Sequence, residues 1–245
     1  MSLMFEELDS RTTPLGEISL RRRADPRLDG KILYEVKLGE EFLMSSLFTE
    51  AEIQLSRLAL NALKETQHQN NLDVVVGGLG LGYTALAALE SEQVNSLVVV
   101  DVMEAVIQWH QQGLVPLGEK LTADARCSLL HADFFALCAS AEKGFYADAS
   151  KKLAHAILLD IDHSPAHWLN QGNSQFYTQQ GLQGLASKMY PGGVFGLWSN
   201  DLPDDAFVDL LKSVFTSVET HIVEFSNPYT LGVSTNSVYL ARRPD

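Results

Sequence analysis

The sequence predicts an α/β protein in which a small N-terminal β-hairpin unit precedes a doubly wound, Rossmann-like sheet of seven strands. The main observation is the alternation of short, apolar, β-branched runs with helical segments from residue 72 onward. Alternating strands and helices require right-handed crossovers and build a parallel sheet covered on both faces. A second observation is that no helix separates the last two strands, so we expect the final strand to run antiparallel.

The first 48 residues show the period of two that is typical of strands. Ile18 and Leu20 alternate with polar neighbours, and the pattern returns after the turn residues Asp29-Gly30. At Thr49 the period becomes that of a helix, with Glu52 three residues later in the capping-box relation. We therefore divide the chain into a β-hairpin unit, residues 1–48, and an α/β domain, residues 49–245.

The elements of the α/β domain follow from the same patterns. Strands are expected at 72–76, 96–100, 126–131, 153–159, 193–199, 217–225 and 235–242, and helices at 84–90, 103–112, 134–140, 175–190 and 204–215. The first run, Leu72 to Val76, is continuous and apolar, as expected of a strand that is buried on both faces.

Charge limits the classes of partner. The 245 residues include 18 basic and 31 acidic side chains, a formal net charge of −13, and nearly all of the excess lies after residue 64. Such an acidic body repels phosphate backbones, so we expect no nucleic-acid partner. The basic cluster Arg21-Arg22-Arg23 with Arg27 and Lys31 is interpreted as a solvated strand-and-turn face, with an anion site as the alternative.

The length of the apolar runs and the number of cysteines indicate the cellular compartment of the protein. No run of about 18 apolar residues occurs, so we expect no membrane span. Cys127 and Cys138 are too few for a disulfide framework and are expected to be reduced thiols. We therefore predict a cytoplasmic protein.

A glycine-rich loop after the first strand of the α/β domain carries most of the functional information. Gly78, Gly80 and Gly82 form this loop, and the next strand ends in Asp101. Glycines let the backbone approach a ligand, and a carboxylate at that strand end can accept hydrogen bonds from both ribose hydroxyls. Both features therefore predict one nucleoside-binding crevice. The G-x-G-x-G spacing favours an S-adenosylmethionine-type ligand over a nicotinamide cofactor, and tight turns without a ligand are a further alternative.

The third strand of this domain ends with a second candidate carboxylate. Asp133 can accept hydrogens of an adenine amino group while Phe134 packs on the ring. Asp133 can equally cap the next helix, and the two roles are compatible. The predicted cofactor-binding residues are Gly78, Gly80, Gly82, Asp101, Val102, Asp133 and Phe134.

Several of these motifs, together with later ones, resemble those of a known family. The relevant segments are the glycine loop, Asp101, Asp133, Ala156–Asp160, Phe176-Tyr177 and Tyr190–Val194. In them the sequence resembles the spermidine synthase (polyamine aminopropyltransferase) family of the class I methyltransferase-like superfamily, over about residues 70–200. The resemblance implies a seven-stranded methyltransferase sheet behind an N-terminal β-domain, and a homodimer. It also implies transfer of an aminopropyl group from decarboxylated S-adenosylmethionine to a diamine.

The segment after the fourth strand departs from the family pattern. The family has Asp-Ser-Ser/Thr-Asp-Pro, whose first aspartate helps deprotonate the attacking amine, and this chain has Asp160-Ile161-Asp162-His163-Ser164-Pro165. The resemblance gives that role to Asp160, whereas His163 replaces the second aspartate. Met103 replaces a second acidic position of the family, and its polyamine-holding Tyr-His-Glu segment has no counterpart in residues 47–52.

We predict Asp160, Asp162 and His163 as the catalytic residues, because such side chains can attract a cationic amine and accept its proton. A metal cluster that also includes His167 is an alternative, but Pro165 interrupts the segment and we expect no metal. Because the polyamine-holding positions are changed, methyl transfer from S-adenosylmethionine to a small, cationic amine is slightly favoured. Aminopropyl transfer and a catalytically silent nucleoside-binding scaffold are the alternatives.

Overall fold

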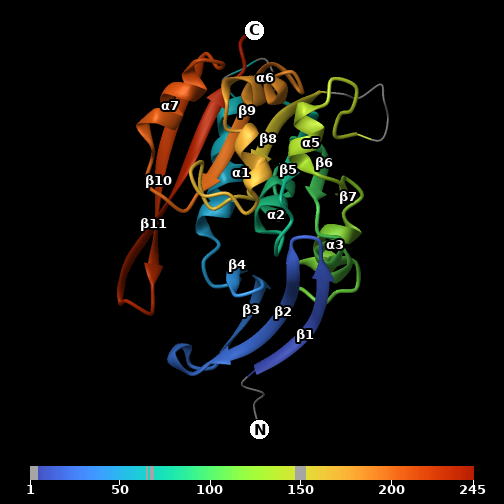
Figure 1. The fold of residues 1–245 in the computed structure, drawn as a ribbon, viewed down its shortest axis with the longest axis vertical. Helices are drawn as coiled ribbons and strands as arrows, with labels where there is room; N and C mark the ends of the chain where they lie inside the picture. The colour runs from blue at the N-terminus through green and yellow to red at the C-terminus, as the bar shows by residue number, and fades with distance from the viewer. Residues whose placement is uncertain (1–4, 65, 67–68, 147–152) are drawn as a thin grey trace.

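The N-terminal part of the chain forms a separate antiparallel sheet (Figure 1). The computed structural model describes residues 5–64, 66, 69–146 and 153–245. Strands β1 (Phe5–Thr13), β2 (Gly16–Asp25), β3 (Lys31–Leu38) and β4 (Glu41–Ser45) pair in chain order. The sheet is larger than the predicted hairpin unit because β1 is also a strand. Its sequence is almost entirely polar, so it lacks the hydrophobic alternation by which strands are recognised.

The second sheet has seven strands in the order β10-β11-β9-β8-β5-β6-β7. They are β5 (Leu72–Gly77), β6 (Val94–Asp101), β7 (Cys127–His131), β8 (Ala154–Leu159), β9 (Met189–Ser199), β10 (Ser217–Asn227) and β11 (Gly232–Arg242). Strands β5 to β9 pair in parallel, and β11 pairs antiparallel with both β9 and β10. The predicted doubly wound α/β fold and its antiparallel last strand are confirmed.

Helices cover both faces of this sheet. One face carries α1 (Glu50–Leu63), α2 (Tyr83–Leu89), α3 (Glu104–Gln111) and α4 (Gly118–Ala123), and the other carries α5 (Phe134–Ala139), α6 (Gln179–Ala186) and α7 (Asp205–Lys212). Successive strand residues alternate between the faces, so Val74 and Val76 join one apolar cluster and Val75 joins the other. None of the described helices is long and apolar enough to cross a membrane.

The predicted helix at 175–190 is too long. A short 3₁₀ turn (Gln171–Gln175) precedes α6, and the Thr178 hydroxyl caps the helix by accepting from the Gly181 amide at 3.1 Å. Strand β9 begins at Met189, so the Tyr190–Gly193 segment belongs to the sheet. The cap at Thr178 and the start of β9 confine the helix to Gln179–Ala186, whose buried face carries Leu182 and Leu185.

The two sheets share one hydrophobic core. Ile18, Leu20 and Val36 of the N-terminal sheet pack in the same cluster as α1 and the sheet residues Val74 and Val76. The boundary at residues 48 and 49 therefore separates two sheets that are packed together.

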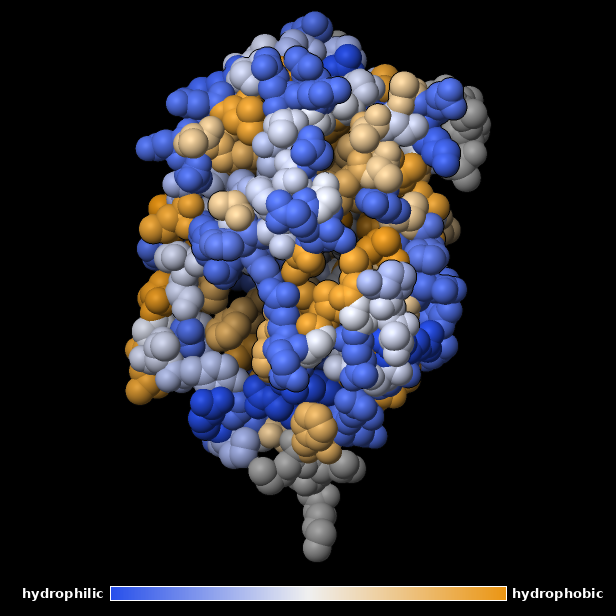
Figure 2. Space-filling model, in the orientation of Figure 1, coloured by the Kyte–Doolittle hydropathy of each residue, from blue (hydrophilic) through white to orange (hydrophobic). Residues whose placement is uncertain are grey.

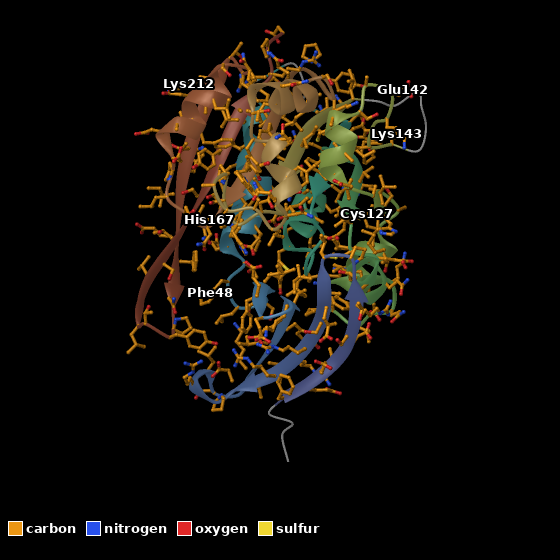
Figure 3. The ribbon with its side chains drawn as sticks, viewed as in Figure 1. Phe48, Cys127, Glu142, Lys143, His167 and Lys212 are labelled. Carbon is orange, nitrogen blue, oxygen red and sulfur yellow. The ribbon has the colours of Figure 1, made fainter. Side chains whose placement is uncertain are left out.

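A contact at the far ends of both sheets joins the β10–β11 hairpin to the N-terminal sheet. Phe48 lies between them (Figure 3), with its ring 5.5 Å from that of Phe225 and 6.2 Å from that of Tyr229. The Tyr229 hydroxyl donates a hydrogen bond of 2.7 Å to the Asp25 carboxylate, and the Arg27 guanidinium lies 4.0 Å from the Tyr229 ring centroid. The β10–β11 hairpin and the N-terminal sheet are thus linked across the space between the two sheets.

Part of the predicted solvated basic face is an ion-pair network, whereas Arg27 and Lys31 of the same cluster are exposed as predicted. Arg23 pairs with Asp25 at 2.7 Å and with Glu35 at 2.9 Å, and Arg21 pairs with Glu35 at 2.8 Å. Asp25 and Glu35 are buried. The hydrogen bonds from Arg23 and Tyr229 lower the pKa of Asp25 well below its usual range. The arginines therefore neutralise internal carboxylates, which leaves no anion site there.

We predict that Tyr229→Phe loosens the hairpin while leaving its aromatic contacts in place. Loss of the hydroxyl removes a hydrogen bond to a charged group, which contributes about 1.5–3 kcal/mol. Amide exchange in residues 222–234, measured by mass spectrometry, should become faster. Thr230→Ala on the same turn is the control and should leave the exchange rates unchanged. Equal rates in the wild type and Tyr229→Phe would show that the hydroxyl does not hold the hairpin.

Candidate active site

A cavity of about 860 Å³ lies where the carboxyl ends of the parallel strands meet the N-terminal sheet. Figure 2 shows the molecule hollowed between that sheet and the β10–β11 hairpin, with apolar residues on the walls. Small-molecule sites have volumes of about 300–1,000 Å³, so this cavity is at the upper end of that range. It has room for a ligand larger than a nucleoside.

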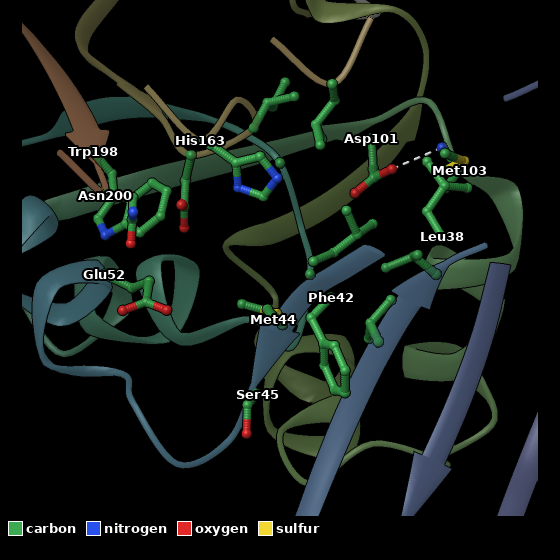
Figure 4. A pocket seen from close by; sticks show the side chains of 18 of the residues that line it. Leu38, Phe42, Met44, Ser45, Glu52, Asp101, Met103, His163, Trp198 and Asn200 are labelled. Carbon is green, nitrogen blue, oxygen red and sulfur yellow. Dashed lines mark hydrogen bonds between the residues drawn. The ribbon is translucent and has the colours of Figure 1, made fainter. Parts of the chain in front are cut away.

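Most of the predicted site residues line this cavity. They are Gly78, Gly80, Asp101, Val102, Asp133, Phe134, Asp160 and His163. Gly82 and Asp162 are not among the residues that line it. Figure 4 shows Asp101 and Met103 on one side of the cavity and Glu52, Trp198 and Asn200 on the other, with His163 between them.

The glycine loop is shaped by the protein that packs around it. Gly78, Gly80 and Gly82 all have positive φ angles. A Cβ on Gly78 would overlap the Asp160 carbonyl oxygen, and one on Gly80 would overlap the Met44 sulfur. These positions need glycine for internal packing as well as for access to a ligand. For Gly82 the neighbours are the side chains of Leu121 and His110, which explains its place outside the cavity wall.

Asp101 and His110 hold the glycine loop in place. One carboxylate oxygen of Asp101 accepts from the Leu79 amide at 2.9 Å and the other from the Met103 amide at 2.7 Å. Burial raises the pKa of Asp101, and the hydrogen bonds from these amides lower it.

The His110 ring, whose pKa is lowered by burial, lies with Nε2 2.9 Å from the Gly80 carbonyl. Because a carbonyl only accepts, Nε2 carries the hydrogen.

Asp133 and Phe134 begin helix α5. Asp133 caps this helix by accepting from the Ala136 amide at 3.0 Å, so the capping role predicted for it is confirmed. Phe134 is buried and stacks on Phe145 with ring centroids 5.3 Å apart. Both residues also line the cavity, which keeps their predicted contact with a nucleobase compatible with the structure.

The other side of the cavity contains a carboxyl pair, the buried Glu52 and the half-buried Asp160. Asp160 follows β8 and accepts a hydrogen bond of 2.7 Å from the Thr84 hydroxyl. The Thr84 carbonyl in turn accepts from the buried Ser56 hydroxyl of α1 at 2.6 Å. Burial raises the pKa of Asp160. Burial and the nearby charge of Asp160 together raise the pKa of Glu52. The pair therefore binds a proton more readily than two separate carboxylates do.

Glu52 is the site residue that the sequence analysis missed. It was interpreted as a capping-box partner of Thr49, but the Thr49 side chain makes no cap hydrogen bond. Glu52 instead lies on the buried face of α1 with Leu55, Ser56 and Ala59, and only 7% of it is exposed. Its spacing of three, four and seven residues from these positions is the signal that places it on the core-facing side.

The structure gives Asp162 and His163 different surroundings from Asp160. Asp162 is buried and accepts from the Leu169 amide, the Asn173 amide group and the Tyr177 hydroxyl, at 2.8 to 2.9 Å. Its hydrogen bonds brace the segment after β8, which is a structural role. His163 lies 2.8 Å from Glu41 of β4, so it links the two sheets through Nε2.

These side chains do not converge on a metal site. Asp160, Asp162 and His163 bind different partners, and His167 lies beside Asp201 at 3.4 Å. Within the described residues no group of three or more His, Cys, Asp or Glu side chains is arranged to hold a metal ion.

Comparison with solved structures defines the fold. It belongs to the class of α/β folds with a methyltransferase-like sheet and an added N-terminal β-sheet, and in particular it is the fold of spermidine synthases. A spermidine synthase in complex with the transition-state analogue AdoDATO matches with a TM-score of 0.71 and 17% identity, over 96% of this chain and 73% of that chain.

Two further structures agree with this. The spermidine synthase from Thermotoga maritima has a TM-score of 0.71 and 16% identity, over 96% of this chain and 72% of its own. A probable spermidine synthase from Corynebacterium glutamicum has a TM-score of 0.62 and 14% identity, over 99% and 80%. No family model and no curated relative matches the sequence. At these identities the likeness confirms the predicted resemblance at the level of the fold.

We predict that Glu52→Gln stabilises the protein at neutral and alkaline pH. The pKa of Glu52 is raised in the folded state, so its unfavourable contribution is absent below the unfolded pKa, grows as the pH rises from the unfolded pKa to the folded one, and is complete above the folded pKa. The melting temperature of the variant should exceed that of the wild type at pH 8 by about 2–4 °C for each kcal/mol relieved, and the difference should vanish near pH 4.

Glu92→Gln, at an exposed position, is the matched control and should behave as the wild type does. A Glu52→Gln variant that is less stable than the wild type at pH 8 would contradict the repulsion between Glu52 and Asp160.

Proposed function

We propose that this protein is a group-transfer enzyme that moves an aminopropyl group from decarboxylated S-adenosylmethionine to an amine. The observation that carries the proposal is the distribution of charge in the cavity. Among the described residues that line it there are four carboxylates, Glu52, Asp101, Asp133 and Asp160, and neither lysine nor arginine. Such a site favours ligands that are cationic and lack a carboxylate of their own.

The nucleoside part of the donor fits the side of the cavity nearest Asp101. The Asp101 carboxylate accepts from the backbone amides of Leu79, Met103 and Gly80, and its remaining acceptor capacity is available to a ribose hydroxyl. Asp133 and Phe134 lie at the end of the neighbouring strand, where the adenine would bind, and the exposed Val102 is available to cover its other face. The cofactor-binding residues predicted from the sequence, apart from Gly82, thus supply one coherent surface.

The charge distribution separates the two donors. S-adenosylmethionine carries a carboxylate beside its amino group, and the described lining residues include no lysine or arginine to neutralise it. Placing that carboxylate near Glu52 and Asp160 would be repulsive. The decarboxylated donor has only the ammonium and the sulfonium, both of which the carboxyl pair attracts. This argument supports aminopropyl transfer over the methyl transfer that the sequence slightly favoured.

The carboxyl pair also suits the chemistry at the acceptor. When bound, the donor supplies a sulfonium-activated carbon. A C–N bond forms from the acceptor nitrogen to this carbon while the C–S bond breaks and sulfur takes its electrons. Asp160 receives the amine proton, and its raised pKa makes it a better acceptor than an exposed aspartate. Thr84 holds one Asp160 oxygen, which leaves the other for the amine.

Similarity to the solved structures gives independent support. One of these spermidine synthases was solved with a transition-state analogue, so proteins of this fold bind such a ligand. A homodimer, which the sequence resemblance implied, remains part of the proposal. Methyl transfer and a silent nucleoside-binding scaffold remain the competing hypotheses, and the next experiment distinguishes them.

We predict that Asp160→Asn lowers kcat for release of methylthioadenosine from decarboxylated S-adenosylmethionine by about 10²–10⁴-fold, the usual contribution of a general base. Turnover would be measured by chromatography with a mixture of amines as acceptors. Asp205→Asn, at an exposed position outside the cavity, is the control and should retain full activity.

Full activity of Asp160→Asn would exclude Asp160 as the proton acceptor. Release of adenosylhomocysteine from S-adenosylmethionine, with none of methylthioadenosine, would instead support methyl transfer. Inactivity of the wild type with both donors would support the scaffold.

A further inference from the structure

We infer that the acceptor is an amine with a single positive charge and an uncharged, largely apolar body, rather than a diamine or polyamine. This inference rests on the proposed function, because it concerns the amine that enters the same cavity. It follows from the positions of the charged groups and from the composition of the wall beyond the carboxyl pair.

Negative charge in the cavity is confined to two places. Asp101 and Asp133 lie at the ends of β6 and β7, on the side that suits the nucleoside, and both already accept backbone amides. Glu52 and Asp160 form the second group of negative charge. Because they repel each other, binding of a proton or a cation between them is favourable. One such pair of carboxyl groups can balance the positive charges of the reacting amine and of the donor's ammonium and sulfonium groups. It leaves no carboxylate for another ammonium.

The wall beyond this pair has aromatic and apolar side chains among neutral polar ones. Its apolar residues are Phe48, Trp198 at the end of β9, and Phe225 and Val233 of the β10–β11 hairpin. Figure 4 shows Trp198 on the same side of the cavity as Glu52. The Phe48 and Phe225 rings pack together at 5.5 Å and continue it toward the hairpin. Apolar walls stabilise an alkyl or aryl group by about 25 cal/mol per Å² of area removed from water.

The polar groups on this wall are neutral. Ser45, Asn200, Asn227, Ser234, Thr235 and Asn236 line it and carry hydroxyl or amide groups. The one lining residue that can become cationic is His163, whose Nε2 is already paired with Glu41. A second ammonium would therefore be desolvated without a carboxylate and close to an imidazole. Burying an unpaired charge is strongly unfavourable, whereas a methyl group in the same place is favourable.

The test uses two acceptors that differ only at the far end. n-Pentylamine and putrescine have the same length, with a methyl group in one where the other has a second amine. With decarboxylated S-adenosylmethionine as donor, we expect kcat/KM for n-pentylamine to exceed that for putrescine by at least about tenfold, since each factor of ten corresponds to 1.4 kcal/mol. Phenethylamine should also be accepted, because the wall is aromatic.

A gain-of-charge variant tests the cause of this preference. Asn200→Asp adds a carboxylate to the wall with almost no change in size, and it should raise kcat/KM for putrescine relative to n-pentylamine by about tenfold. Gln183→Glu makes the same change of charge on the exposed surface of α6, outside the cavity, and should leave the ratio unchanged.

The outcomes separate this inference from the proposed function. Transfer to putrescine equal to or faster than transfer to n-pentylamine would overturn the inference and leave aminopropyl transfer intact. If neither amine is aminopropylated, the proposed reaction fails, and calorimetry of the two amines with the protein decides the inference. Tighter binding of n-pentylamine would then support it, and tighter binding of putrescine would overturn it.

Discussion

Two carboxyl groups that share a buried space, Glu52 and Asp160, are the constraint around which this site is built. Keeping them together costs free energy, because both lose water and each repels the other. The fold maintains them through contacts that are not themselves charged. Ser56 binds the Thr84 carbonyl, the Thr84 hydroxyl binds Asp160, and the Asp160 carbonyl occupies the space that a side chain at Gly78 would need. Helix α1, which supplies Glu52, packs on the seven-stranded sheet at β8, β9 and β11.

This arrangement explains why the N-terminal sheet is part of the site rather than an appendage. Met44 of β4 packs on the glycine loop, and Glu41 of the same strand binds His163 of the segment after β8. At the opposite end, Tyr229 and Asp25 join the β10–β11 hairpin to the sheet. The cavity is thus enclosed by elements from both ends of the chain, and the apolar part of its wall comes mainly from these late and early segments. The carboxyl edge of the α/β sheet and helix α1 supply the acidic side chains of the cavity, and the enclosing elements supply much of its apolar wall.

Much of the fold was predictable because buried parallel strands have a strong local signature. The runs at 72–76 and 96–100, the glycine loop and the carboxylates at the strand ends all follow from short segments of sequence. Strand β1 was missed because its residues are polar, and helix α6 was overextended because its N-cap at Thr178 was not recognised. Glu52 and the ion pairs of Arg23 depend on contacts between distant segments. Local periodicity does not contain that information, although the position of Glu52 on the apolar face of α1 was a usable clue.

The central claim is that the charge of the cavity selects a donor without a carboxylate. Calorimetric titration of the protein with S-adenosylmethionine and with its decarboxylated form tests it most directly. The decarboxylated donor is expected to bind at least about tenfold more tightly, and the difference should shrink in the Glu52→Gln/Asp160→Asn variant, where the repulsion is removed. Equal or tighter binding of S-adenosylmethionine by the wild type would contradict the account.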